Sequence, residues 1–201
     1  MDSQPDRRRI PEPTRRQFAG ALAGAALLRA PRVTAEETVY EFTPADNGAG
    51  PLWDYGAAGV VRFRNHLYVP GLDTLSGYKP LNNCRWTLYQ RDPDGWKRLL
   101  ADEKERQREP CPIGVFDDGR LVLSVNPTLA PPEAYNGPAD PQLLFFSTRD
   151  FNRPPTVLRP GWSTKFSLTE HTYRGLGIDG RKGELLTLHN GGNGTSRAFW
   201  A

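Results

Sequence analysis

The chain has 201 residues and a formal net charge of +3, with 24% charged and 10% aromatic residues. Residues 1–35 hold seven arginines and three acidic residues, a local charge of +4, so the remaining residues carry a net charge of −1. A nearly neutral chain without a basic stripe has no electrostatic basis for binding nucleic acid.

Residues 1–35 have the features of an export signal. Arg7 to Arg9 form a basic start, and residues 14–18, Thr-Arg-Arg-Gln-Phe, resemble the twin-arginine export signal. Residues 18–28 are weakly apolar and too short to span a bilayer, and Val33-Thr34-Ala35 supplies the small residues that a signal peptidase reads. We expect cleavage after Ala35, a periplasmic or extracellular protein, and no membrane attachment after signal removal. A short N-terminal helix of the mature domain is the alternative.

An N-terminal strand and linker are expected over residues 36–58, with the strand at 38–42, and one pattern then occurs three times. Each copy begins with two apolar strands around a tight turn, and turns rich in Asn, Asp and Gly supply the positive φ of hairpins. The expected hairpin strands are residues 60–63 and 66–69, 113–116 and 120–125, and 175–178 and 184–188. Third strands are expected at 86–89, 143–146 and 196–200, and fourth strands at 96–99 and 156–158.

Four antiparallel strands per repeat are typical of a β-propeller blade. The sequence therefore predicts an all-β fold, a β-propeller fragment of about two and a half four-stranded blades. The incomplete propeller covers residues 59–201, with blades at about 59–101, 110–160 and 172–201. Open blade edges favour self-association or aggregation, so we expect the isolated segment to be marginally stable.

The long links should mark the functional end of the blades. Links between second and third strands are long, at 70–83, 126–141 and 190–195, and leave the blades at the same end as the blade-to-blade connections. Binding and catalysis usually use such loops.

Two of the turns between third and fourth strands look like degenerate Asp-boxes, at residues 90–96 and 147–151. On these turns the chain resembles the BNR-repeat, sialidase-like β-propeller superfamily over about residues 60–201. That superfamily includes glycoside hydrolases, polysaccharide lyases and non-catalytic glycan binders. The resemblance implies recognition or cleavage of an extracellular polysaccharide, with carboxylated sugars favoured. A non-catalytic binding module and a truncated product without function are the alternatives.

The richest polar cluster is residues 170–174, just before the first strand of the third repeat. His171 and Tyr173 are candidates for a base–acid pair, and Arg174 for holding a carboxylate bidentately. The corresponding positions of the other repeats add substrate-binding candidates. These are Arg108, Glu109, Asp54 and Tyr55, and Glu170 of the cluster itself is a further candidate. The alternative is structural: such residues also join neighbouring blades, with Arg174 paired to Glu109.

Two cysteines and three histidines provide little material for a metal site. Cys84 and Cys111 form a disulfide or remain buried thiols. No His-x-x-x-His or Cys-x-x-Cys spacing is present, so neither a metal ion nor a cofactor is expected.

Overall fold

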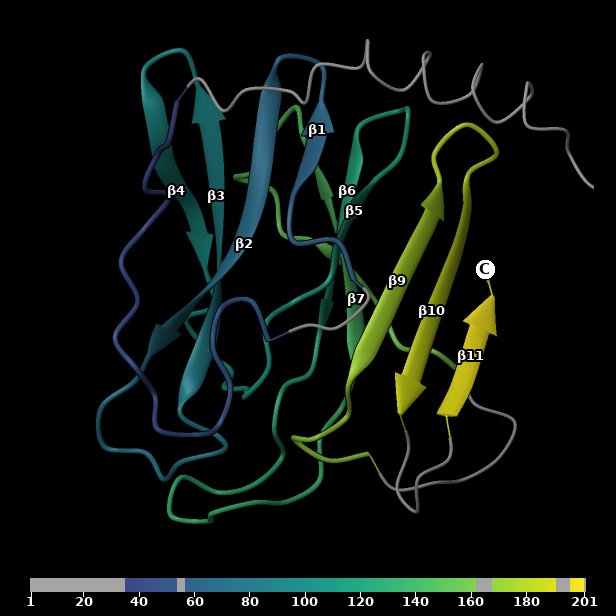
Figure 1. The fold of residues 1–201 in the computed structure, drawn as a ribbon. Coiled ribbons are helices and arrows are strands. Elements are labelled where there is room, and N and C mark those ends of the chain that lie inside the picture. The colour runs from purple at the N-terminus through teal and green to yellow at the C-terminus, as the bar shows by residue number, and fades with distance from the viewer. Residues whose placement is uncertain (1–34, 54–56, 162–167, 191–195, 201) are drawn as a thin grey trace, which may run out of the picture. The chain divides into compact units, whose positions relative to one another are not determined.

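The computed structural model describes residues 35–53, 57–161 and 168–190, and the backbone of residues 196–200. The chain divides into two units, Met1–Glu37 and Thr38–Ala201, and every strand lies in the second. The expected export signal falls outside the described residues except for Ala35. All regular secondary structure in the described part of the chain is β-strand (Figure 1), which confirms the all-β class. Nowhere in that part does a helix occur with the length and apolar character needed to cross a bilayer.

The strands form three antiparallel sheets, and none of the sheets closes on itself. Within each sheet, strands pair in chain order. The first sheet contains β1 (Val61–Phe63), β2 (His66–Thr74), β3 (Cys84–Asp92) and β4 (Gly95–Ala101). The second contains β5 (Ile113–Val115), β6 (Arg120–Val125), β7 (Gln142–Ser147) and β8 (Thr156–Leu158). The third contains β9 (Arg174–Asp179), β10 (Glu184–Asn190) and β11 (Ser196–Trp200). These sheets coincide with the three repeats of the sequence.

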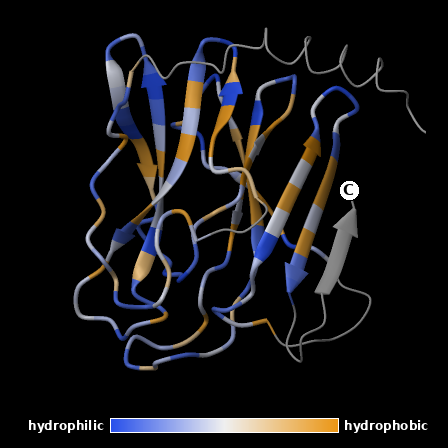
Figure 2. Ribbon diagram, viewed as in Figure 1, coloured by the Kyte–Doolittle hydropathy of each residue, from blue (hydrophilic) through white to orange (hydrophobic). Residues whose placement is uncertain are grey.

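Apolar and polar residues alternate along parts of the strands (Figure 2), and buried apolar side chains form one cluster on each side of the second sheet. On β6, Leu121 and Leu123 point toward the first sheet and pack with Trp86. Val122 points the other way and packs with Leu185 of the third sheet. The second sheet is therefore sandwiched, whereas each of the other two packs on a neighbouring sheet through one face only among the described residues.

The first strands of the three sheets lie side by side, β1 next to β5 and β5 next to β9. The backbone N–H of Ile113 donates to the carbonyl of Ala58 over 3.2 Å, and that of Asp117 to the carbonyl of Gly180 over 3.3 Å. The sheets thus share one line of first strands, from which their later strands extend.

One expected strand is wrong. Residues 38–42 join no sheet; instead the ring of Tyr40 stacks on that of Tyr89, with centroids 4.7 Å apart. The Tyr40 hydroxyl also accepts a hydrogen bond from the backbone N–H of Leu72 over 3.2 Å. The alternating apolar residues that suggested a strand are explained by this side-chain packing, which needs no backbone partner.

Strand β2 runs further than expected, because it continues through Pro70, which the sequence suggested as the start of a loop. Pro70 pairs with Leu88 of β3, whereas β1 ends opposite Tyr68. At Pro70 the strand therefore has a partner on one side only, where the missing N–H of proline is tolerated.

Close contact between first strands makes Gly114 of β5 sensitive to substitution. A Cβ atom there would collide with Ile178 of β9, lying 2.9 Å from its Cγ1 and closer still to its Cδ1. We expect Gly114→Ala to lower the free energy of unfolding by about 1–3 kcal/mol in urea denaturation. The matched control is Gly177→Ala on β9, because a Cβ atom there meets nothing within 4 Å. Equal stability of the two variants would contradict the close packing of β5 against β9.

Candidate functional site

The long links of the sheets come together at the end of the strands opposite the hairpin turns (Figure 1). We call their surface the long-link face, formed by residues 75–83, 102–112, 126–141 and 168–173. Hydrogen bonds tie the links together. Arg106 donates to the carbonyl of Asn82 over 3.0 Å and to that of Ala130 over 2.6 Å. The N–H of Ala139 donates to the carbonyl of Leu168 over 2.9 Å.

Glu170 and His171 form the clearest chemical pair on this face. Glu170 is buried, and one of its carboxylate oxygens accepts the backbone N–H of Gly137 over 3.1 Å. Its other oxygen lies 2.9 Å from Nδ1 of His171, whose imidazole is largely exposed. A buried carboxylate thus contacts one ring nitrogen of a partly exposed imidazole, an arrangement in which histidine can act as a general base.

Tyr173 and Arg174 separate at the start of β9. Tyr173 is exposed beside His171, whereas Arg174 is 3% exposed and turns into the interior. Its guanidinium donates to the carbonyls of Pro110, Thr172 and Ser124 over 2.9, 3.1 and 3.3 Å. These contacts join the second and third sheets, which is a structural role. The structure therefore brings the exposed His171 and Tyr173 together with the buried Glu170, and Arg174 lies in the interior with a structural role.

Arg108 and Glu109 are buried as well. Arg108 Nη1 lies 2.6 Å from Glu109 Oε1, and Arg108 Nε donates to the carbonyl of Asn47 over 2.8 Å. Both side chains are less than 7% exposed, so they serve the packing of the links. Asp54 and Tyr55, the remaining substrate-binding candidates, lie outside the described residues.

Cys84 and Cys111 are buried reduced thiols rather than a disulfide. The side-chain amide of Gln107 donates to Cys111 Sγ over 3.1 Å, and that of Asn47 to Cys84 Sγ over 3.4 Å. Burial raises the pKa of the Cys84 thiol to about 11, so it stays protonated at neutral pH. Among the described residues, no group of three or more His, Cys, Asp and Glu side chains is arranged to hold a metal ion.

Two further exposed tyrosines on the long-link face were missed at the level of sequence. Tyr78 lies in the link between β2 and β3, with the Arg106 guanidinium 4.7 Å above its ring. Tyr135 lies in the link between β6 and β7, where its carbonyl accepts a hydrogen bond from Asn82 over 3.3 Å. Together with Tyr173 they place one exposed tyrosine in each of three links. Their positions in long links could have marked them as candidate binding residues from the sequence.

Comparison of the sequence with protein-family models and with curated proteins gives no match. The resemblance to the sialidase-like propellers therefore rests on the repeat and on the two Asp-box-like turns. In the first turn Asp92 Oδ1 accepts from the N–H of Asp94, and in the second Asp150 Oδ1 accepts from the N–H of Asn152, each over 3.1 Å. The two aspartates stand at different places in their turns, because Asp92 pairs across its turn with Gly95, whereas Asp150 pairs with Ser147.

Proposed function

We propose that this chain is an exported glycan-recognition protein built as part of a β-propeller, with the long-link face as its binding surface. The observation that carries the proposal is the set of three exposed tyrosines on the long-link face, which also carries the Glu170–His171 pair. Sugar rings stack their C–H faces on aromatic rings and offer hydroxyl groups to nearby polar side chains, so such a surface suits an oligosaccharide.

Support for the propeller comes from the arrangement of the sheets. Their first strands share one line, and the second sheet is sandwiched between the other two. A radial set of four-stranded sheets with binding loops at one end is the propeller plan. Export is part of the proposal because residues 14–18 resemble the twin-arginine signal.

A preference for carboxylated sugars needs a cation at the surface. Arg108 and Arg174 are buried, but Lys79 is exposed next to Tyr78 in the same link. We therefore assign Lys79 as the group that meets a sugar carboxylate. Lys79 thus takes the role in uronate recognition that the sequence suggested for Arg108 and Arg174.

Glycan binding can be tested with the purified chain by calorimetric titration against neutral and uronate-containing oligosaccharides. We expect Tyr135→Ala and Tyr173→Ala each to weaken binding about 2- to 12-fold, the worth of one aromatic stacking contact. Tyr173→Phe keeps the ring and should retain most of the affinity. The control is Val157→Ala, an exposed apolar residue on β8 away from this face. Failure of every oligosaccharide to bind, or alanine variants that bind like the parent chain, would overturn the proposal.

Cleavage is the second candidate, favoured by the Glu170–His171 pair alone. If the chain cleaves its glycan, His171→Ala should abolish turnover while the affinity for an uncleaved oligosaccharide changes little. Turnover that survives this substitution would exclude His171 as the base.

A further inference from the structure

The first and second sheets leave a groove between their outer strands. It has a volume of about 550 Å³ and lies between β3 and β4 on one side and β7 and β8 on the other. Every residue that lines it belongs to the described part of the chain, and the third sheet contributes none of them. We call it the outer groove. Its volume is within the range of protein sites for small organic molecules.

The floor of the outer groove is apolar and closely packed. Trp86, Leu144 and Phe146 belong to the buried cluster between the two sheets and are 7%, 7% and 4% exposed. The rings of Trp86 and Phe146 meet edge to face with centroids 6.0 Å apart, and the Phe151 ring lies 6.3 Å from that of Phe146. Val157 of β8 adds an apolar side chain that is 44% exposed. Because the floor is already ordered, a ligand that rests on it has little ordering cost to overcome.

Charged side chains surround this apolar floor, mainly in the segment that follows β4. The lining includes three carboxylates and three cations. Half of these six side chains are held in ion pairs, so they are not available to select a ligand by its charge. The pairs are Arg153 with Asp150 over 3.1 Å, Arg159 with Asp140 over 2.7 Å, and Glu103 with Arg85 over 2.9 Å.

Glu105 differs from these paired groups. Its carboxylate makes neither a hydrogen bond nor an ion pair with any residue in the described part of the chain. Burial raises the pKa of the Glu105 carboxyl above its usual value, and the charges of Asp102 and Asp140 add to the rise. Arg159 and Lys104 act in the opposite direction without cancelling it. A further cation beside Glu105 would therefore stabilise its charged form.

We propose that the outer groove binds an organic ammonium ion, with the apolar body of the ligand on the aromatic floor and its ammonium group beside Glu105. The two parts of such a ligand match the two parts of the groove. A neutral molecule with the same body would leave Glu105 without a partner, and an organic anion would be repelled by Glu105 and Asp102. The inference rests on the groove and not on glycan recognition.

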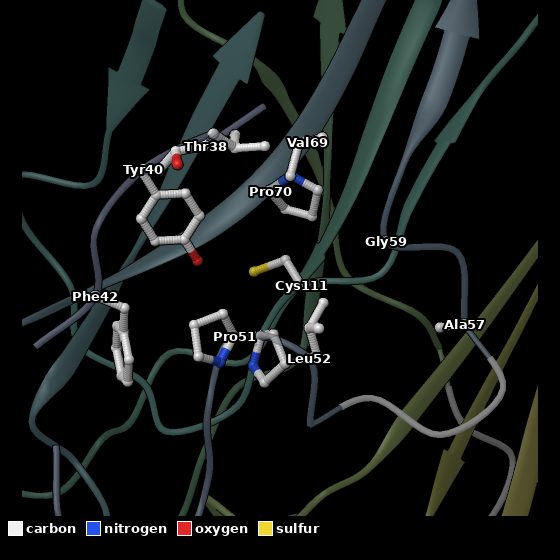
Figure 3. A pocket seen from close by; sticks show the side chains of 12 residues that line it. Thr38, Tyr40, Phe42, Pro51, Leu52, Ala57, Gly59, Val69, Pro70 and Cys111 are labelled. Carbon is white, nitrogen blue, oxygen red and sulfur yellow. The ribbon is translucent and has the colours of Figure 1, made fainter. Parts of the chain in front are cut away.

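A second hollow, of about 370 Å³, lies beside Tyr40 and Cys111 (Figure 3). The described residues that line it include no charged side chain. It therefore offers no group that would select an ammonium ion over a neutral molecule, whereas the outer groove does.

The first test uses three probes with the same phenyl ring: phenethylammonium, the neutral phenethyl alcohol and the anion hydrocinnamate. Each is titrated into the full chain up to about 10 mM, because ligands of this size bind with about millimolar affinity. The indole N–H signal of Trp86 in NMR spectra, identified by its loss in Trp86→Phe, reports binding at the floor. We expect phenethylammonium to bind about 2- to 5-fold more tightly than the alcohol, the value of a solvent-exposed ion pair. Hydrocinnamate should bind more weakly than the alcohol.

Two substitutions locate the binding site. Glu105→Gln should lower the affinity for phenethylammonium about 2- to 5-fold and leave the affinity for the alcohol unchanged. The control is Glu133→Gln, because Glu133 is an exposed glutamate in the link between β6 and β7 and does not line the groove. Val157→Trp should fill the groove and abolish binding of all three probes, with an unchanged thermal unfolding curve.

Three results would overturn the inference. They are a Trp86 signal that phenethylammonium does not shift, equal affinities for the ammonium ion and the anion, and a preference for the ammonium ion that survives Glu105→Gln. The same variants are then titrated with the oligosaccharides. If glycan binding is retained where ammonium binding fails, this inference falls and the proposed function stands.

Discussion

Replacing Arg174 with alanine is expected to lower the free energy of unfolding by about 3 kcal/mol or more, because three buried carbonyl groups lose their donor. The guanidinium donates to the carbonyls of Pro110, Thr172 and Ser124. Alanine would leave these buried acceptors without their donor, and each orphaned group adds its own desolvation cost. Urea denaturation of the parent chain and the variant measures the difference.

The same substitution separates the two roles considered for Arg174. A group that only holds substrate can be removed with little effect on stability, whereas a group that joins two sheets cannot. Arg149→Ala provides the control, because Arg149 is exposed at the turn after β7 and should change stability by no more than about 0.5 kcal/mol. An Arg174→Ala variant as stable as this control would show that the contacts with the three carbonyls contribute nothing.

Alternation along β9 could have placed Arg174 correctly from the sequence. Leu176 and Ile178 are the apolar residues of this strand, and Arg174 has the same parity, so all three share the face packed on the second sheet. Tyr173 has the opposite parity and is exposed. The sequence analysis grouped His171, Tyr173 and Arg174 because they are close in the chain. It did not consider that successive side chains of a strand point to opposite faces.

The strands and hairpins were predictable because their signals are local. Apolar alternation and turn residues with positive φ, such as Gly119 and Gly183, fix each hairpin within about ten residues. The long-link face was not predictable in the same way. Tyr78 and Tyr135 lie 57 residues apart and meet through contacts of Arg106 and Asn82, which belong to no sequence pattern. The packing of Tyr40 on Tyr89 is equally non-local.

Acid is expected to destabilise the fold through His189, at the end of β10. This side chain is fully buried, its Nε2 lies 3.0 Å from Thr187 Oγ1, and Arg174 is its cross-strand partner. Burial, followed by the charge of Arg174, lowers the pKa of His189 from 6.5 to about 3. The folded state therefore holds His189 neutral at a pH where the unfolded state already binds a proton.

Stability from this residue is fully present above pH 6.5 and is lost as the pH falls toward 3. The loss should reach about 1.4 kcal/mol per pH unit, or about 2 kcal/mol between pH 7.5 and pH 5. Urea denaturation across that range, above the ordinary pKa values of Asp and Glu, should show a shallower slope for His189→Gln than for the parent chain. If His189→Gln loses stability with acid as steeply as the parent chain, His189 is not the group that the folded state keeps neutral.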